Sequence, residues 1–377
     1  IRTDGRRSFG RHQPAYAIFL PEANKRETTV KNYIHLKILG MASLCLFSFC
    51  SLPAGSAHAA DGTENVGVSN PPAMKAPNVT TSEIWQDPSQ PLDARVQDLL
   101  SRLTMEEKVR MLTVAASTRF MGVPRMGIPN MISSDGPRGP HGPVGYPCGI
   151  SMGSSFDPAL IKEEASAMGQ ECRARGIAML YGPAININRD PLAGRFFEYY
   201  TEDPCLDAKL AVAFVQGVQS QNVCACAKHF VCNNRDWNRD NYMSVVDLRT
   251  LHEIYFPAFK AAVEDGHVWA VMTAANGLNN EFCSDSHFLL TDVLENTWGF
   301  KGFIFTDGIG SHSTIPAALA GLDVSNLGQP ARSLFGKPLL EAVQSGKIPM
   351  HVINEKVRRI LRVMAWAGNL NEGGIKP

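Results

Sequence analysis

The sequence lacks a net charge, because its 377 residues include 36 basic and 36 acidic side chains. Residues 1–59 hold eight of the basic and three of the acidic residues, which leaves 28 and 33 for the rest of the chain. The main part of the chain is therefore mildly acidic. Such a charge balance gives no electrostatic footprint for nucleic acid, and we expect no partner of that kind.

Signatures of bound cofactors and metals are also missing. No glycine-rich dinucleotide fingerprint follows the first expected strand, and no Cys/His pair at zinc spacing accompanies Cys224 and Cys226. The alternating run CACAKHF that contains these two cysteines is instead typical of a buried strand in which Cys acts as a small hydrophobic residue. We therefore expect no cofactor and no metal.

The longest apolar run, Ile38–Leu52, is too short to span a membrane comfortably. Lysines precede it, and small residues ending in Ala57-His58-Ala59 follow it. This order is typical of a secretory signal peptide. We expect export to the periplasm or the exterior after cleavage near Ala59, and no membrane span in the mature chain.

Helical and strand patterns alternate after the leader. The predicted domains are a leader (1–59), an N-terminal extension (60–92) and one folded domain (93–377). Capping signals and apolar spacing predict helices over 104–112, 157–176, 203–219, 247–265, 286–297 and 350–367. Short apolar segments predict strands at 130–133, 177–181, 223–227, 268–273, 303–305 and 322–324.

This alternation predicts an α/β protein with parallel strands and crossover helices. The span of about 93–368 has the usual size of a (β/α)8 TIM barrel, with an open doubly wound sheet as the alternative. Trp237 and Trp269 are expected to be packing residues.

Polar residues follow successive predicted strands, where barrel enzymes build their sites. A pocket that combines carboxylates with Lys, His and Arg suits sugar hydroxyls, since each hydroxyl both donates and accepts hydrogen bonds. A different interpretation takes Lys228 as a Schiff-base lysine at a strand end. The candidate residues of the pocket are Asp135, Arg195, Lys228, His229, Arg239 and Asp307.

The chain contains, in this order, the motifs SSDGPRGP, YGPAININRDPLAGRFFEYYTEDP, AKHFVCNNRDWNRD, VWAVMTAANGLNN, WGFKGFIFTDGIGSHST and AALAGLDVSN. These ordered motifs resemble those of glycoside hydrolase family 3, the group of β-glucosidases and exo-glucanases. The resemblance covers about residues 95–370. It implies a retaining mechanism in which Asp307 attacks the anomeric carbon of a terminal β-D-glucose. It also implies that Asp135, Arg195, Lys228, His229, Arg239 and Met272 bind the substrate, a β-linked glucoside or a short oligosaccharide.

The sequence departs from the family pattern in three places. Gly308 stands where an aromatic residue usually follows the nucleophile, and Ala275 stands where a Tyr is common. In most of the family a second α/β sandwich domain supplies a Glu as the general acid/base. The chain ends at Pro377, so we expect that domain to be absent and a partner chain or missing domain to supply the acid.

These departures leave an alternative open, in which the chain is a truncated or degenerate sugar-binding barrel with little or no hydrolysis. Glu198 and Glu202 lie in the FEYYTEDP motif and are interpreted as structural. Glu281 and Asp285, after the fourth predicted strand, are weak candidates for the general acid.

Overall fold

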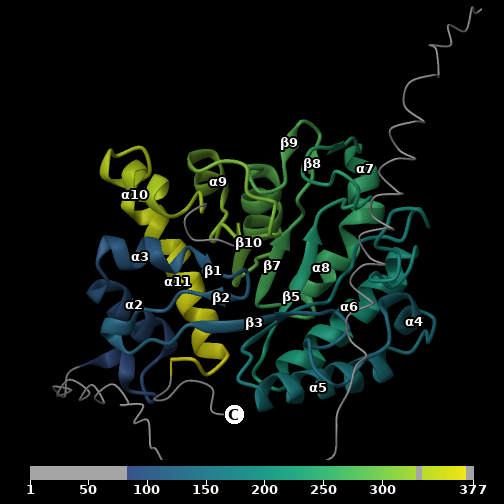
Figure 1. Cartoon of the computed structure of the whole chain (residues 1–377), viewed down its shortest axis with the longest axis horizontal. Helices are drawn as coiled ribbons and strands as arrows, with labels where there is room; N and C mark the ends of the chain where they lie inside the picture. Colours follow the sequence, from purple (N-terminus) through teal and green to yellow (C-terminus); the bar gives the residue numbers. More distant parts are fainter. Residues whose placement is uncertain (1–82, 328–332, 371–377) are drawn as a thin grey trace, which may run out of the picture. The chain divides into compact units, whose positions relative to one another are not determined.

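A seven-stranded sheet organises residues 83–327 and 333–370, the part of the chain that the computed structural model describes (Figure 1). The strand order is β1-β2-β3-β4-β5-β7-β10. Strands from β3 to β10 run parallel, whereas β2 is antiparallel to both of its neighbours. The strands are β1 (Val114–Ala115), β2 (Arg119–Phe120), β3 (Met131–Asp135), β4 (Met179–Tyr181), β5 (Cys224–Phe230), β7 (Ala270–Thr273) and β10 (Phe303–Thr306).

Helices connect and cover these strands. Helix α5 packs on β4, and helices α6 and α8 pack on β5, while α11 packs on β10 and on helices α2 and α3 (Figure 1). The α-helices are α2 (Leu92–Arg102), α3 (Met105–Met111), α4 (Gly149–Gly153), α5 (Pro158–Ala174), α6 (Pro204–Gln219), α7 (Leu248–Thr250), α8 (Pro257–Glu264), α9 (Ile315–Ala320), α10 (Lys337–Gln344) and α11 (Met350–Trp366). Two π-helices, η3 (Leu251–Tyr255) and η4 (Phe288–Thr297), and two 3-10 helices, η1 (Ile84–Gln86) and η2 (Pro124–Met126), complete the set of described helices.

Local signals in the sequence position the helix starts as predicted. Thr104 and Glu107 form a reciprocal capping box at the start of α3, which satisfies two otherwise unpaired backbone N–H groups. Asp157 and Asp203 cap α5 and α6, and a Pro occupies the first position of each helix. All six predicted helical segments are present, although the segment at 286–297 is a π-helix and the one at 247–265 contains one.

The sheet is a mixed one, which differs from the all-parallel pattern expected. The short strands β1 and β2 were not predicted, because two-residue strands carry no measurable periodicity. The predicted strand at 322–324 contributes only isolated parallel bridges, from Val324 to Phe305 and from Ser325 to Thr113. A separate three-stranded sheet joins β6 (Met243–Ser244), β8 (Gly277–Leu278) and β9 (Glu281–Phe282).

The seven-stranded sheet is curled, as contacts between aromatic rings from distant strands show. Phe120 of β2 packs edge-on against Phe303 and Phe305 of β10, with ring centroids 5.4 and 5.3 Å apart. Tyr181 of β4 lies 5.3 Å from Phe305. Strands β2 and β10 lie far apart in the strand order, so these contacts require the sheet to bend round a shared core.

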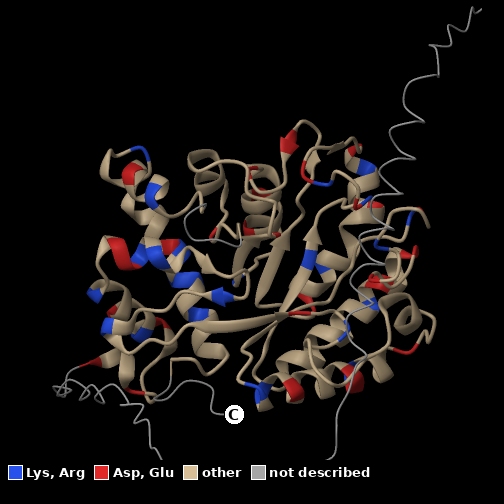
Figure 2. Cartoon of the chain, in the orientation of Figure 1, with Lys and Arg blue, Asp and Glu red and all other residues tan. Residues whose placement is uncertain are grey.

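Charged residues lie mainly outside this core. Figure 2 shows both signs mixed along the outer helices, and β7 and β10 carry no charged residue. Within the described ranges, no helix has the length and apolar character needed to cross a membrane. The predicted signal peptide and most of the predicted extension lie outside the described residues.

The aromatic core gives a first prediction. Phe305→Ala removes a fully buried ring and should lower the free energy of unfolding by about 3–5 kcal/mol. Phe156 is 73% exposed, and Phe156→Ala should change the free energy of unfolding by no more than about 0.5 kcal/mol. Urea unfolding of both variants measures this difference, and equal losses would contradict the curled-core packing.

A second prediction concerns Asp207 in the first turn of α6, which is fully buried with neither carboxyl oxygen hydrogen-bonded to a described residue. Burial, together with nearby Asp203, raises the pKa of Asp207 well above its ordinary value of 3.8. The folded state therefore binds a proton that the unfolded state has released, and stability falls as pH rises above about 4.

Asp207→Asn abolishes this titration. The stability of the wild type relative to the variant should fall by about 1.4 kcal/mol per pH unit above pH ~4, until the folded carboxyl itself ionises. Urea unfolding of both proteins at pH 4, 5, 6 and 7 measures the difference. Parallel stability curves would show that Asp207 is not protonated in the folded protein.

Candidate active site

The carboxyl ends of the parallel strands bring the predicted residues to one edge of the sheet. Asp135 ends β3, Lys228 and His229 lie in β5, Met272 lies in β7, and Asp307 directly follows β10. Side chains alternate between the faces of a strand, so Asp307 shares a face with Phe303 and Phe305 of the curled core. Arg195 and Arg239 reach the same edge from the loops that follow β4 and β5.

A buried ammonium group lies at the centre of the site. Lys228 Nζ donates to Asp135 Oδ1 at 2.6 Å and lies 3.2 Å from Glu198 Oε1. Arg195 binds the same Glu198 through two hydrogen bonds, of 2.7 and 2.9 Å. Four charged groups from β3, β5 and the loop after β4 thus form one network.

The charges within this network stabilise each other. Burial favours neutral Lys228, yet Glu198 and Asp135 outweigh it and raise the pKa of Lys228 above its ordinary value. Burial likewise favours neutral Asp135, but the Lys228 ammonium dominates and lowers the pKa of that carboxyl. Lys228 is therefore a cation and Asp135 an anion at neutral pH. Protonated Lys228 is a poor candidate for a Schiff base, which requires a free amine.

Asp307 has one oxygen held and one oxygen without a hydrogen bond. Oδ1 accepts the backbone N–H of Gly308 at 2.7 Å. Oδ2 has no hydrogen-bond partner among the described residues, although Arg239 Nε lies 3.5 Å away and His229 Nε2 3.9 Å away. The carboxylate is thus fixed in direction while one oxygen stays available for a reaction partner.

His229 is buried and neutral. Burial, with Arg195, Lys228 and Arg239 nearby, lowers the pKa of His229 well below its ordinary value of 6.5. Asn186 holds its backbone, accepting the His229 N–H and donating to its carbonyl, both at 2.9 Å. His229 can therefore offer hydrogen bonds without adding positive charge beside Asp307.

Two carboxylates of the site were not predicted as functional. Asp236 pairs with Arg239 and lies 4.0 Å from Arg195, so it links the two arginines. Glu198 was interpreted as structural, and the structure places it between Lys228 and Arg195 at 5% exposure. Both carboxylates lie in loops, where no periodicity shows which way a side chain points.

A hollow of about 500 Å³ opens beside this network. Its walls come from the loop after β3, which is rich in Gly and Pro, and from the loops after β4 and β5. Phe197 lines it at 47% exposure, with the Arg138 guanidinium 5.5 Å from its ring. The charged residues along the walls are Asp135, Arg138, Arg195, Glu198, Asp236 and Arg239.

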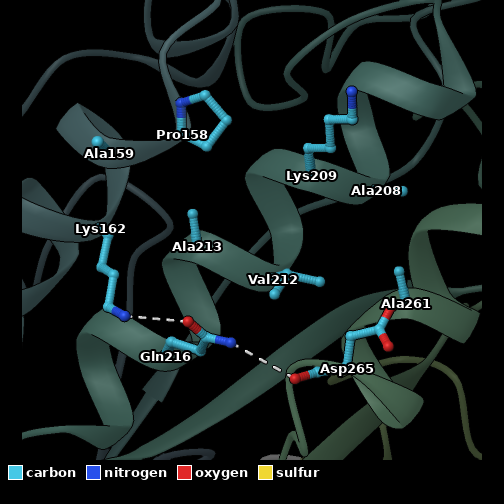
Figure 3. A pocket seen from close by; sticks show the side chains of 10 residues that line it. All are labelled: Pro158, Ala159, Lys162, Ala208, Lys209, Val212, Ala213, Gln216, Ala261 and Asp265. Carbon is cyan, nitrogen blue, oxygen red and sulfur yellow. Dashed lines mark hydrogen bonds between the residues drawn. The ribbon is translucent and has the colours of Figure 1, made fainter.

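A second hollow, of about 480 Å³, lies among helices α5, α6 and α8 (Figure 3). Gln216 accepts from Lys162 Nζ at 3.0 Å and donates to the Asp265 carbonyl at 3.5 Å. The walls of this hollow are otherwise largely aliphatic, and none of the network residues lines it. Asp135, Arg195, Glu198, Asp236 and Arg239 line the first hollow, whereas Lys228, His229 and Asp307 lie behind its walls, within contact distance of those residues.

The remaining candidates lie outside the charge network. Met272 is 3% exposed and pairs in register with Lys228 and Phe305, so its contact with a substrate stays a prediction. Glu281 is exposed on β9, and Asp285 accepts the Ser284 hydroxyl at 2.7 Å. Trp237, expected to pack, is instead 77% exposed in the loop that follows β5. In the described part of the chain, no three His, Cys, Asp or Glu side chains form a group that could hold a metal ion.

The site combines fixed donors and acceptors with an available carboxylate oxygen. Asp135 is half-exposed beside Lys228, so the pair can accept from and donate to neighbouring hydroxyl groups. Asp307 Oδ2 accepts no hydrogen bond from a described residue, which suits attack on, or stabilisation of, an electron-poor carbon. This combination fits a polyhydroxylated substrate.

Comparisons with known proteins agree with this chemistry. The model of the glycosyl hydrolase family 3 N terminal domain matches residues 94–363. A beta-glucosidase of Bacteroides ovatus is 38% identical over 308 residues, and the match covers 74% of this chain and 41% of that protein. The thermostable beta-glucosidase B of Acetivibrio thermocellus is 37% identical over 287 residues, with 72% and 38% covered.

Solved structures give the same result. Beta-glucosidase 3B from Thermotoga neapolitana, in complex with alpha-D-glucose, superposes with a TM-score of 0.69 at 36% identity. The match covers 75% of this chain and 44% of that one. The chain therefore spans less than half the length of these relatives.

Glu198 allows a direct test of the network. Glu198→Gln leaves two buried cations with one anion fewer and should lower the free energy of unfolding by about 3 kcal/mol. Glu202 belongs to the same motif but is exposed, so Glu202→Gln should change the free energy of unfolding by less than about 0.5 kcal/mol. Equal effects in urea unfolding would contradict the network.

Proposed function

Because the chain belongs to glycosyl hydrolase family 3, we propose that it is a retaining β-glucosidase. Its substrates are β-linked glucosides or short oligosaccharides, from which it releases the non-reducing terminal β-D-glucose. The curated relatives support this assignment, since their names describe beta-glucosidases. A solved relative that holds glucose supports the terminal sugar.

Asp307 is the nucleophile in this proposal. Its Oδ2 forms a bond to the anomeric carbon as the bond to the leaving oxygen breaks, and water then attacks the covalent glucosyl ester to release β-glucose. The observation that carries the proposal is the state of the two carboxylate oxygens of Asp307. Oδ1 accepts the Gly308 N–H, whereas Oδ2 lies 3.5 Å from Arg239 Nε and accepts no hydrogen bond from a described residue. A carboxylate with both oxygens hydrogen-bonded to protein donors would be a weaker nucleophile.

The charge network holds the terminal glucose over Asp307. Asp135 accepts from hydroxyl groups, while Lys228 and Arg195 donate, and neutral His229 donates or accepts at the same edge. Charged side chains form stronger hydrogen bonds to hydroxyl groups than neutral side chains do. The network therefore fixes the sugar by its hydroxyl groups.

A general acid must protonate the leaving oxygen, with its carboxyl group about 5–5.5 Å from that of the nucleophile. In the described part of the chain, neither Glu281 on β9 nor Asp285 after it forms a hydrogen bond or ion pair with the charge network. We propose that the acid comes from a second domain or a partner chain. The length of the relatives, more than twice the matched region, supports this origin.

Two further expectations stand as proposals. The bridges from Phe305 to Val324 and from Ser325 to Thr113 support a sheet that closes into a barrel between β10 and β1. Lysines, an apolar run and small residues in the leader support export of the protein.

Covalent trapping tests the nucleophile. 2-Deoxy-2-fluoro-β-glucosyl fluoride carries an activated leaving group and needs no general acid, so it should label one residue, Asp307, found by peptide mass spectrometry. Asp307→Asn should abolish labelling and preserve glucose binding in calorimetry. Absence of any adduct in a glucose-binding protein would favour a sugar-binding barrel without hydrolysis.

A further inference from the structure

The segment that follows Asp307 has few side-chain contacts close to the carboxylate. Residues 307–314, which we call the Asp307 loop, connect β10 to α9. A Cβ atom added at Gly308 would meet no heavy atom within 4 Å, and Ile309 is 44% exposed. The Gly308 N–H nevertheless holds Asp307 Oδ1. The position of the Asp307 loop therefore sets the direction of the carboxylate, and contacts later in the loop must fix that position.

Two side chains further along fasten the Asp307 loop to its surroundings. Ser311 Oγ lies 2.9 Å from Thr306 Oγ1 and 2.8 Å from Ser325 Oγ, which ties the loop back to the end of β10. His312 Nε2 lies 3.1 Å from the Ala275 carbonyl oxygen. A carbonyl oxygen can only accept a hydrogen bond, so His312 Nε2 carries a proton and donates it. His312 thus joins the Asp307 loop to the loop that follows β7.

The imidazole ring of His312 is held by an aromatic partner from a different element. It stacks on Phe282 of β9, with the ring centroids 3.4 Å apart and the ring planes within 8° of each other. Strand β9 belongs to the three-stranded sheet, in which Phe282 lies opposite Gly277 of β8. A ring that already lies against a fixed partner loses little further freedom when it donates a hydrogen bond. The stack therefore aims the His312 N–H at its acceptor.

The acceptor, the Ala275 carbonyl, is also fixed. Ala275 is 1% exposed, and a Cβ atom added at Gly310 would lie 3.1 Å from the Ala275 Cα, so the two loops lie directly against each other. The next residue, Asn276, is fully buried and donates through Nδ2 to the Val231 carbonyl at 3.1 Å. Val231 directly follows β5, the strand that carries Lys228. The loop after β7 is thereby tied to the strand at the centre of the charge network.

We propose that His312, held by Phe282, is a positioning residue for the nucleophile Asp307. Its hydrogen bond to Ala275 fixes the Asp307 loop relative to β5 and β7, and through the Gly308 N–H it fixes Asp307 Oδ1, while Oδ2 stays available for attack. This inference rests on the proposed function, since it concerns the direction in which the nucleophile attacks. His312 acts through the Asp307 loop and does not bind the sugar.

Trapping with 2-deoxy-2-fluoro-β-glucosyl fluoride separates positioning from sugar binding. An Asp307 oxygen bonds to the anomeric carbon while fluoride leaves with its electron pair. The limiting rate constant of inactivation reports this bond formation, and the dissociation constant of the reagent reports sugar binding. His312→Phe keeps a ring on Phe282 but removes the N–H donor. It should lower the limiting rate constant roughly tenfold or more, because small misplacements of a reacting group are costly, and change the dissociation constant by less than about twofold.

Further variants test the hydrogen bond and the stack separately. His312→Gln offers an amide N–H to the Ala275 carbonyl and should recover most of the limiting rate constant. Phe282→Leu should lower this constant too, and the double variant with His312→Phe should lose no more than the larger single loss, because both residues act through one link. His287→Phe is the matched control, since His287 is an exposed histidine that pairs with Asp292 on η4, and it should leave both constants unchanged. An unchanged limiting rate constant in His312→Phe would overturn the proposal, and so would an equal loss of sugar affinity.

Amide hydrogen exchange separates this inference from the proposed function, because it needs no substrate. The Gly310 N–H donates to the Asp307 carbonyl at 2.9 Å within the Asp307 loop. Mass spectrometry should show that peptides covering this loop exchange roughly threefold faster or more in His312→Phe than in the wild type, while peptides around Lys228 exchange equally in both. If the fluoride does not label the wild type, the proposed hydrolysis fails, yet exchange still decides whether His312 holds the loop. Equal exchange of the Asp307 loop in both proteins would overturn the proposal.

Discussion

The buried ammonium group of Lys228 is the constraint on which the rest of the site depends. A cation with a side chain 3% exposed must be paired, because an unpaired buried charge costs several kcal/mol, on the order of 3–5. Asp135 and Glu198 supply the pairing from β3 and from the loop after β4. Since Glu198 also holds Arg195, one buried charge fixes the positions of three segments at the carboxyl edge of the sheet.

This pairing determines how Asp307 differs from the other carboxylates. Asp135, Glu198 and Asp236 each accept a hydrogen bond from a cation of the protein. Asp307 instead accepts the Gly308 N–H on one oxygen, while its other oxygen lies 3.5 Å from Arg239 Nε without a hydrogen bond among the described residues. The neutral state of His229 fits the same division, because a further cation in contact with Asp307 would compete for that oxygen. In the proposed function, the network binds the sugar and Asp307 reacts with it.

The sequence was sufficient for six helical segments and for five of the six predicted strands, because period and caps carry that information. It did not predict helices α2, α4, α9 and α10. It was not sufficient for β1 and β2, which are two residues long, or for the ring contacts between β2 and β10 that accompany the curl. Trp237 was wrongly expected to pack, because it lies in a loop, where the direction of a side chain follows from tertiary contacts alone.

The stereochemistry of the first product tests the central claim most directly, since an attack by Asp307 followed by an attack by water inverts the anomeric carbon twice. Proton NMR can follow hydrolysis of 2,4-dinitrophenyl β-glucoside, whose leaving group needs no acid, before the free sugar mutarotates. The account predicts that β-glucose forms first. Initial formation of α-glucose would contradict it, because a single displacement by water would then replace the covalent step on Asp307.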